Sequence, residues 1–592
     1  MKRTIYYKVR KMAKGILPFY LFTLLPLMTS CVDTVILPDN KTVDDDFWQK
    51  KSEVDAVVST AYAQLRDESA IRNMIVWGDF RSDELLPVLA PELPSSAAYY
   101  TALQQIYSLN IETENAFTSW YPFYSAINYC NLVLQKAEGV IAVDPDYTRG
   151  DYEANKAQVL ALRAFCYFYL TKVFHDIPVT PGAYLNSSAD LNAPQAAPDS
   201  VLTMCIQDLE EALKNAIPGN TYGDWRDKGY LNKDGINAVL ADIYLWRASV
   251  NRDASDYQKC VDYCDEVIKA KKQAYEESGQ HRRWGEENVK QDYYLSDYDD
   301  MYDDLFGQNG QNADESIFEL QFRNSNATNK GLDQMYFRYN NASANSYGYF
   351  KAAPLYGTVK SDGTGIWNNS VDQRLYEYLY DATSTSVEQF GVRKFVATTS
   401  AGTNNTADSH RDTRTNMLQN WIFYRLTDVM LMKAEALVQL YELGGKADGD
   451  TRNEDAFNIC KFINERALSD ANKSSYALKY STYKDKMESL VLAERARELC
   501  FEGKRWFDLM RYNYRHMTTK ADLTKKLSDD DYAVVTNSSE FYELALRKYA
   551  VPSAMKAKMR DERYLYMPIN QDEVELNSSL KQNPVYKSAA KY

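Results

Sequence analysis

The sequence predicts a mostly α-helical protein, in which a scaffold of antiparallel helix pairs carries one long irregular region. From Phe47 onward, apolar residues recur at spacings of three and four, which is the period of one face of a helix. Residues 272–420 lack that period and are rich in Gly, Asn, Ser, Asp and Tyr. Irregular stretches of this length inside a compact protein usually carry function, so we expect the ligand-binding surface there.

The helices are expected in pairs that are joined by short turns. The predicted pairs cover about 117–137 with 154–174, 234–250 with 256–271, and 424–442 with 453–468, and a single helix covers about 200–216. Helices of about 15 residues with small Ala side chains at their contacts resemble tetratricopeptide hairpins. The fold class is therefore a tetratricopeptide-like helical hairpin scaffold with a loop-rich insertion.

The first 30 residues have the character of a secretory signal peptide. Six Lys or Arg residues precede a short apolar run from Gly15 to Leu27, which is too short to span a bilayer comfortably. The small residues before Cys31 resemble a bacterial lipobox, with Met28 at the position where Leu is usual. This resemblance implies that Cys31 is acylated and that an acyl chain attaches the mature protein to a membrane. The alternative is an ordinary signal peptide with an incidental Cys.

Charge and cysteine content exclude several functional classes. The chain has a formal charge of −14, and without its basic leader the remainder is near −20, which argues against nucleic acid as a partner. The seven cysteines after Cys31 lie in apolar helical patterns and lack metal-ligand spacing. We expect them to be small buried apolar residues and not to form a complete disulfide framework.

Five motifs occur in one order along the chain, and each also has a physical interpretation. They are Trp120–Leu134 (WYPFYSAINYCNLVL), Gln158–Val179 (QVLALRAFCYFYLTKVFHDIPV), Trp421–Ala436 (WIFYRLTDVMLMKAEA), Glu494–Arg511 (ERARELCFEGKRWFDLMR) and Tyr564–Tyr586, which contains QNPVY. In the fourth motif, charges of opposite sign alternate at spacings of three and four. A catalytic acid cluster is one interpretation, but we favour a network of ion pairs that locks two helices together.

The five motifs resemble those of the SusD/RagB family, from the lipobox to the C-terminus, and the resemblance weakens across 272–420. His175, Asn570 and Val585 replace the family's usual Gly, Pro and Gly. The resemblance divides the chain into a signal peptide (1–30), a lipidated tether (31–46), a SusD-like N-terminal helical region with tetratricopeptide-like hairpins (47–271), the loop-rich ligand-binding region (272–420) and a RagB/SusD C-terminal helical region (421–592).

The resemblance implies a surface-exposed, lipid-anchored protein of the outer membrane that binds nutrient and performs no catalysis. It implies that the chain captures an oligosaccharide and passes it to a SusC-like TonB-dependent transporter. The alternative within the family is a RagB-like protein that binds peptides. A surface hydrolase and a repeat adaptor between proteins are rival functions outside the nutrient-binding role.

Aromatic residues in predicted loops are the candidates for ligand contact, because flat rings stack on the apolar faces of sugars. Their positions outside the helical stripes set them apart from Trp120, Trp246, Trp421 and Trp506, which belong to predicted helices and are expected in the core. The candidates are Trp284, Trp367, Tyr99, Tyr100, Tyr293, Tyr294 and Tyr298. The alternative for each is a structural role in the core.

The sequence contains no signature of catalysis, of a metal centre or of a cofactor. The four His residues form no HExxH motif or close metal-ligating pair, and no nucleophile elbow, Walker A loop or dinucleotide fingerprint is present. The acidic run at residues 296–304 lacks the Gly and the terminal Glu of an EF-hand loop, so we expect a solvated acidic loop. We therefore predict a binding protein without metal or cofactor.

Overall fold

The structure is a computed structural model that describes residues 47–88, 97–184, 192–278, 293–296, 298–307, 310–322, 327–336, 348–357, 365–380, 390–397 and 417–586. Cys31, the predicted lipidation site, and Trp284, a predicted ligand contact, lie outside these residues. The described chain is mainly helical, with three short two-stranded sheets.

The N-terminal part of the protein is built from long helices. They are α1 (Lys51–Gln64), α2 (Glu68–Ile75), the π-helix η1 (Val76–Phe80), α3 (Tyr100–Tyr107), α4 (Tyr121–Val140), α5 (Arg149–Phe174), α6 (Pro198–Leu213), α7 (Arg226–Gly229), α8 (Lys233–Asn251) and α9 (Ala254–Ser278). Local sequence sets their boundaries. Thr148 and Asp151 form a capping box at the start of α5, and the Asn232 side chain accepts from the Gly235 N–H at the start of α8.

Short elements connect this part to the C-terminal helices. The middle contains α10 (Tyr298–Leu305), α11 (Lys330–Met335), α12 (Pro354–Gly357) and α13 (Arg374–Tyr378), and the strands are β1 (Leu85–Pro87), β2 (Ile177–Pro178), β3 (Gln195–Ala196), β4 (Ser316–Leu320), β5 (Phe350–Ala352) and β6 (Trp421–Arg425). All three strand pairs are antiparallel: β1 with β5, β2 with β3, and β4 with β6.

The C-terminal part returns to helices. It contains α14 (Leu426–Leu443), α15 (Arg452–Arg466), α16 (Asp470–Tyr476), α17 (Tyr480–Tyr483), α18 (Met487–Glu498), α19 (Arg505–His516), α20 (Ser539–Ala545), α21 (Ser553–Met559), the 3₁₀ helix η2 (Glu562–Leu565) and α22 (Gln571–Leu576). Within the described ranges, no helix combines the length and the apolar character that crossing a membrane requires.

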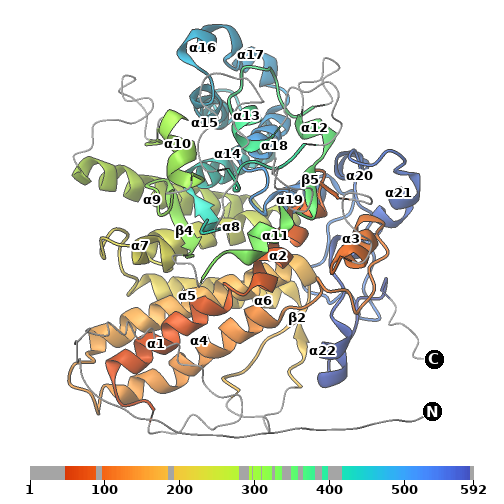
Figure 1. Cartoon of the computed structure of the whole chain (residues 1–592). Helices are drawn as coiled ribbons and strands as arrows, with labels where there is room; N and C mark the ends of the chain where they lie inside the picture. Colours follow the sequence, from red (N-terminus) through yellow and green to blue (C-terminus); the bar gives the residue numbers. More distant parts are fainter. Residues whose placement is uncertain are drawn as a thin grey trace, which may run out of the picture.

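The long helices form one continuous stack, as the sequence predicts. Successive helices α1, α4, α5, α6, α8, α9, α14, α15 and α18 each pack on the next. Figure 1 shows α1, α4 and α5 as the lower layer, α8 and α9 above them, and α14 to α18 at the top. The predicted helix pairs are confirmed as α4–α5, α8–α9 and α14–α15, and the predicted apolar stripes of α8 and α9 are buried.

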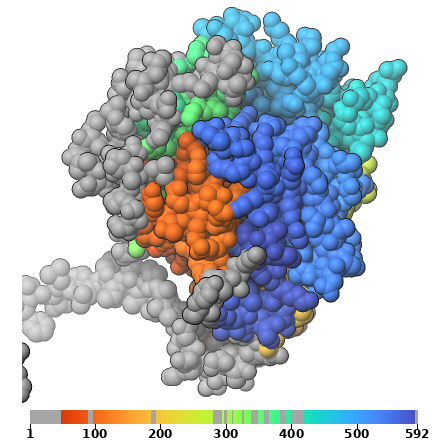
Figure 2. Space-filling model, turned by 90° about the vertical axis from the view of Figure 1, so that its right-hand side faces the viewer, coloured from red at the N-terminus to blue at the C-terminus, as the bar shows by residue number. Residues whose placement is uncertain are grey.

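The helix α3 and the C-terminal segments meet on one side of the molecule. The Tyr107 ring lies 4.6 Å from the Tyr549 ring, and the Lys558 Nζ donates to the Leu109 carbonyl at 2.7 Å. Figure 2 shows this face, where α3, drawn orange, lies directly beside the blue C-terminal segments. N-terminal and C-terminal segments therefore share one core and do not form separate halves.

The described parts of residues 272–420 pack into the molecule instead of projecting from it. Their buried aromatic residues include Tyr302, Phe306, Phe318, Tyr336, Phe350, Tyr356, Trp367 and Phe395. The β1–β5 and β4–β6 pairings join this region to residues on both sides of it in sequence. These aromatic side chains fill the space between the helical parts, so loop position did not indicate exposure there.

The charges of the Glu494–Arg511 motif form buried ion pairs, as favoured from the sequence. Glu498 accepts from Arg374 at 3.0 Å, from Arg425 at 2.7 Å and from Arg466 at 2.8 Å. All four side chains are at most 1% exposed. Because Arg374 begins α13, Arg425 ends β6 and Arg466 ends α15, the network joins more elements than the two helices expected. The seven cysteines after Cys31 are free and buried, as expected.

Candidate functional site

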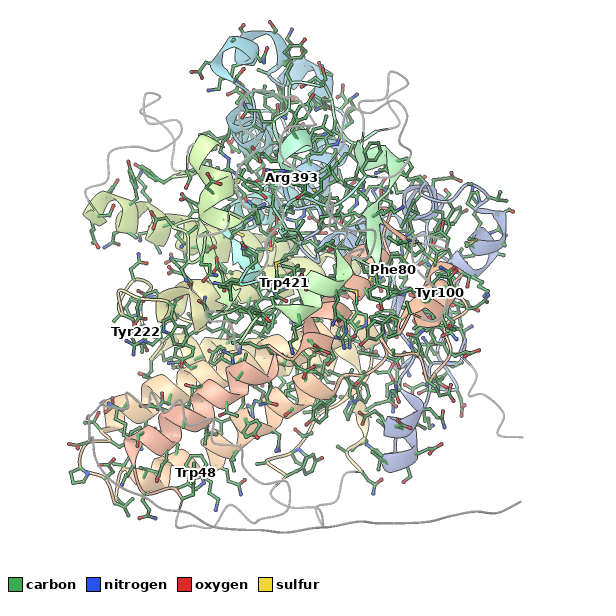
Figure 3. All side chains as sticks on the ribbon, in the orientation of Figure 1. Trp48, Phe80, Tyr100, Tyr222, Arg393 and Trp421 are labelled. Carbon is green, nitrogen blue, oxygen red and sulfur yellow. The ribbon has the colours of Figure 1, made fainter. Side chains whose placement is uncertain are left out.

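The predicted ligand contacts that the structure describes do not form one site. Tyr99 and Tyr100 lie at the start of α3, and Tyr293 and Tyr294 lie beside α9 and α15, where Tyr294 stacks 4.5 Å from Tyr275 and Tyr293 lies 5.6 Å from Phe462. Figure 3 shows Tyr100 on one side of the body and Tyr222, near α7, on the other. Tyr298 begins α10. These positions make at least two separate aromatic groups.

Tyr99 is half-buried among other rings. Its ring lies 5.4 Å from Phe117 and 5.5 Å from Tyr349, and the Arg72 guanidinium lies 4.8 Å above it. Tyr100 packs near Val88 in a small satellite cluster. Both rings therefore already have apolar neighbours, and only their remaining edges are open to a ligand.

Trp367 lies in the core. Its side chain is 3% exposed, and its indole N–H donates to the Tyr356 carbonyl at 2.6 Å. A ring enclosed on both faces offers no surface on which a sugar could stack in this conformation. These surroundings agree with the alternative interpretation of Trp367 from the sequence, in which the ring has a structural role in the core.

A groove of about 520 Å³ lies where α1 ends and α4 begins, and an exposed tyrosine borders it. Tyr121, the first residue of α4, is 65% exposed. Its neighbours Trp120 and Pro122 are buried, and Trp120 packs 5.2 Å from Phe174. Because both flanking residues face the core, the chain turns the Tyr121 ring outward at the helix start.

Beside Ala63, Pro122, Phe322 and Ala327, six polar side chains line this groove, which we call the Tyr121 groove. They are Gln64, Arg66, Asp67, Glu68, Thr328 and Lys330. Asp67 accepts from the Ser69 N–H at 2.8 Å and so caps α2, and Glu68 pairs with Arg72 at 3.0 Å. These two carboxylates are therefore held in place by the start of α2.

Two cations in the groove have open hydrogen-bonding capacity. In the part of the chain that the structure describes, neither the Arg66 guanidinium nor the Lys330 ammonium forms a hydrogen bond or an ion pair. Partial burial lowers the pKa of Arg66 below its ordinary value. Several N–H donors beside an exposed aromatic face can hold a ligand that has both hydroxyl groups and an apolar side.

Tyr121 was not predicted, because ligand contacts were sought among aromatic residues in predicted loops and Tyr121 lies in the helical Trp120–Leu134 motif. One signal could have found it. Tyr121 lies between Trp120 and Pro122 at a helix start, off the stripe that Phe123, Ala126 and Ile127 continue. Among the described residues, no three His, Cys, Asp or Glu side chains come close enough to hold a metal ion.

Comparison with known proteins gives one consistent family. Residues 245–586 match the family described as the SusD family, and residues 38–245 match a family described as "Starch-binding associating with outer membrane". The two matches meet at residue 245, inside α8. A SusD-like protein of Formosa agariphila is 23% identical over 519 residues, which cover 84% of this chain and 90% of that protein.

Solved structures share the fold. A SusD homologue from Bacteroides thetaiotaomicron superposes with a TM-score of 0.65 at 16% identity, covering 91% of this chain and 98% of that one. Surface glycan-binding protein A from Bacteroides uniformis gives 0.61 at 17% identity, with coverages of 90% and 99%. At these identities the likeness establishes the fold alone. Since the SusD family match covers more than half of the residues, the chain belongs to the SusD family.

Proposed function

We propose that this protein captures oligosaccharides at the cell surface and binds them in the Tyr121 groove without cleaving them. The observation that carries the proposal is the 65% exposed Tyr121 ring beside a groove lined by hydrogen-bonding side chains. Sugars present C–H faces that stack on aromatic rings, and hydroxyl groups that accept from cations and amides.

Family membership supports this proposal. The family that matches residues 38–245 is described by starch binding and by association with the outer membrane, and one structural neighbour is described as a surface glycan-binding protein. An exposed aromatic platform also favours a glycan over a peptide ligand, which we keep as the alternative. The remaining loop aromatics, Trp284 among them, stay predictions as further contacts.

The cellular context of the proposal comes from the N-terminus and the family. We propose that Cys31 is acylated, that the acyl chain holds the protein on the outer membrane, and that the cargo passes to a SusC-like TonB-dependent transporter. Mass spectrometry of the mature N-terminal peptide tests the anchor: a diacyl or triacyl adduct on Cys31 supports it, and an unmodified Cys31 contradicts it.

The binding site is tested by replacing Tyr121 and measuring glycan affinity. A panel of polysaccharides and peptide mixtures first identifies a ligand, and titration calorimetry then compares variants. Tyr121→Ala should weaken glycan binding by about 10-fold, because it removes the stacking face, whereas Tyr121→Phe keeps the ring and should stay within about 3-fold.

Tyr476 provides a matched control, because it is also an exposed helical tyrosine, at 44%, but lies on α16, away from the groove. Tyr476→Ala should leave affinity unchanged. Equal glycan affinity in Tyr121→Ala and the unmodified protein would show that the Tyr121 groove is not the glycan-binding site. Binding of peptides and of no glycan would show that the ligands of this protein are peptides.

A further inference from the structure

A second pocket, of about 320 Å³, lies between the last turns of α9, the helix α7 and the segment before β4. Its lining includes Asn220, Lys228, Lys271, Tyr275, Tyr294 and Asp314. Tyr294 is one of the aromatic residues that the sequence singled out, and its ring packs against Tyr275 at the edge of this pocket. In Figure 3, the label of Tyr222 marks the neighbourhood, since the Tyr222 N–H donates to Asp227, one residue before Lys228.

Two buried lysines define this pocket. Lys228 and Lys271 are each 7% exposed, although both line an open pocket. The Lys271 ammonium donates to the backbone carbonyls of Asp314 at 2.9 Å and Ser316 at 2.5 Å. The Lys228 ammonium makes a long contact of 3.4 Å with the Asn220 side-chain oxygen and acts on the neighbouring Lys271.

Neither lysine is ion-paired among the described residues, although the carboxyl groups of Glu277 and Asp314 also line the pocket. Throughout the described ranges, no carboxylate forms an ion pair with Lys228 or Lys271, although Asp234 and Asp314 act on Lys271 from a distance. Burial, together with the neighbouring Lys228 ammonium, lowers the pKa of Lys271 well below its ordinary value. Ammonium groups that are buried in proteins are normally paired or bound to a ligand, so two adjacent amines that line an open pocket fit an anionic group.

We propose that the Lys228–Lys271 pocket binds the anionic group of an acidic sugar, either a carboxylate or a sulfate ester. The two ammonium groups neutralise the anion, and the Tyr275–Tyr294 pair borders the space that the sugar ring occupies. The sugar part of this inference rests on the proposed glycan capture, whereas the anion site rests on the lysines alone. This pocket is distinct from the Tyr121 groove, with which it shares no lining residue.

The experiment titrates the full protein with sodium sulfate, D-glucuronate and D-glucose, and keeps the ionic strength constant with sodium chloride. Calorimetry measures the heat of binding, and thermal unfolding measures the melting temperature. Sulfate or glucuronate should bind saturably and raise the melting temperature, whereas glucose and chloride should not. Binding of glucuronate alone assigns a carboxylate-bearing ligand, and binding of sulfate alone assigns a sulfate ester. Absence of saturable binding by both anions overturns the proposal.

Charge removal provides the second test. Lys228→Gln keeps a group that can reach Asn220 but removes the positive charge, and should weaken anion binding at least 10-fold. Lys269→Met, on the exposed side of α9, is the matched control and should bind like the unmodified protein. Equal anion affinity in Lys228→Gln and the control also overturns the proposal.

The two sites fail in distinguishable ways. If the anion pocket is wrong but glycan capture is right, Lys228→Gln and the unmodified protein bind neutral oligosaccharides equally and neither binds the anions. If the Tyr121 groove is wrong, Tyr121→Ala leaves neutral glycan binding intact, and sulfate or glucuronate still binds at Lys228.

Discussion

Two carboxyl groups, Asp79 and Glu84, lie buried in the core, and neither forms an ion pair with any residue that the structure describes. Asp79 accepts from the Gly503 N–H at 2.9 Å and from the Tyr336 hydroxyl at 3.2 Å, and Glu84 accepts from the Phe501 N–H at 3.1 Å. Burial raises the pKa of Asp79 to about 7, and burial together with the Asp79 charge raises the pKa of Glu84. The folded protein therefore holds a proton on this pair that the unfolded chain releases.

This pair should make stability depend on pH between about 4 and 7. A raised carboxyl pKa means that the folded state binds more protons in this window, so the pair's contribution to the unfolding free energy rises as pH falls. Asp79→Asn supplies a permanently neutral side chain that still accepts from Gly503. Urea unfolding at pH 5 and pH 8 should show a smaller pH difference in the variant. Identical pH dependence in both proteins contradicts this assignment.

Glu498 should be among the side chains whose loss costs most stability. Glu498→Gln removes the negative charge that Arg374, Arg425 and Arg466 share, and breaking a buried ion pair costs about 3–5 kcal/mol. Denaturant unfolding measures this loss. Glu138→Gln is the control, because the Glu138–Arg149 pair is about 60% exposed and should contribute almost nothing. A loss equal to that of the control would show that the network is not stabilising as a unit.

At the residue scale, the features that could be predicted from the sequence are those that follow from the helical period. The buried cysteines and the ion pairs of Glu494–Arg511 follow from spacing along helices, and both are confirmed. Periodicity says nothing about a side chain outside a repeating pattern. Trp367 in a predicted loop is therefore buried, and Tyr121 in a predicted helix is exposed, because long-range packing decides both positions.

At the element scale, the π-helix η1 packs against the turn at Gly503 without intervening side chains. A Cβ added at Gly78 would overlap the Gly503 backbone, which cannot move like a flexible side chain. Gly503 itself has a φ of +73°, a conformation that favours glycine. This close approach brings the Gly503 N–H to Asp79.

Gly78→Ala should therefore destabilise the protein by roughly 1–3 kcal/mol through overpacking. Gly139→Ala in α4 is the matched control, because nothing lies within 4 Å of the added Cβ, and it should stabilise by about 0.5–1 kcal/mol through helix propensity. Thermal unfolding of both variants measures the difference. Equal melting temperatures would contradict the close packing of η1.

The long helices could be predicted from the sequence, whereas the strand pairings could not. The pairs α4–α5, α8–α9 and α14–α15 lie near their expected ranges because the helical period is local information. The β1–β5 and β4–β6 pairs join Leu85 to Ala352 and Leu320 to Trp421, and short strands so distant in sequence leave no local signal.

At the scale of the whole molecule, β4 connects the two proposed binding sites. Asp314, just before β4, lines the Lys228–Lys271 pocket, and Phe322, just after it, lines the Tyr121 groove. An extended segment of this length spans on the order of 25 Å. The segment that contains β4, paired with β6 and packed against α7 and α8, therefore runs from one site to the other.

The proposed function requires that the protein binds a glycan and releases it without cleaving it. Its most direct test incubates the purified protein with a polysaccharide that it binds, and measures saturation by calorimetry and product size by chromatography in the same sample. Saturable binding and a polysaccharide of undiminished length after prolonged incubation are the expected results. Shortened products, or no saturable binding to any polysaccharide of a broad panel, would contradict it.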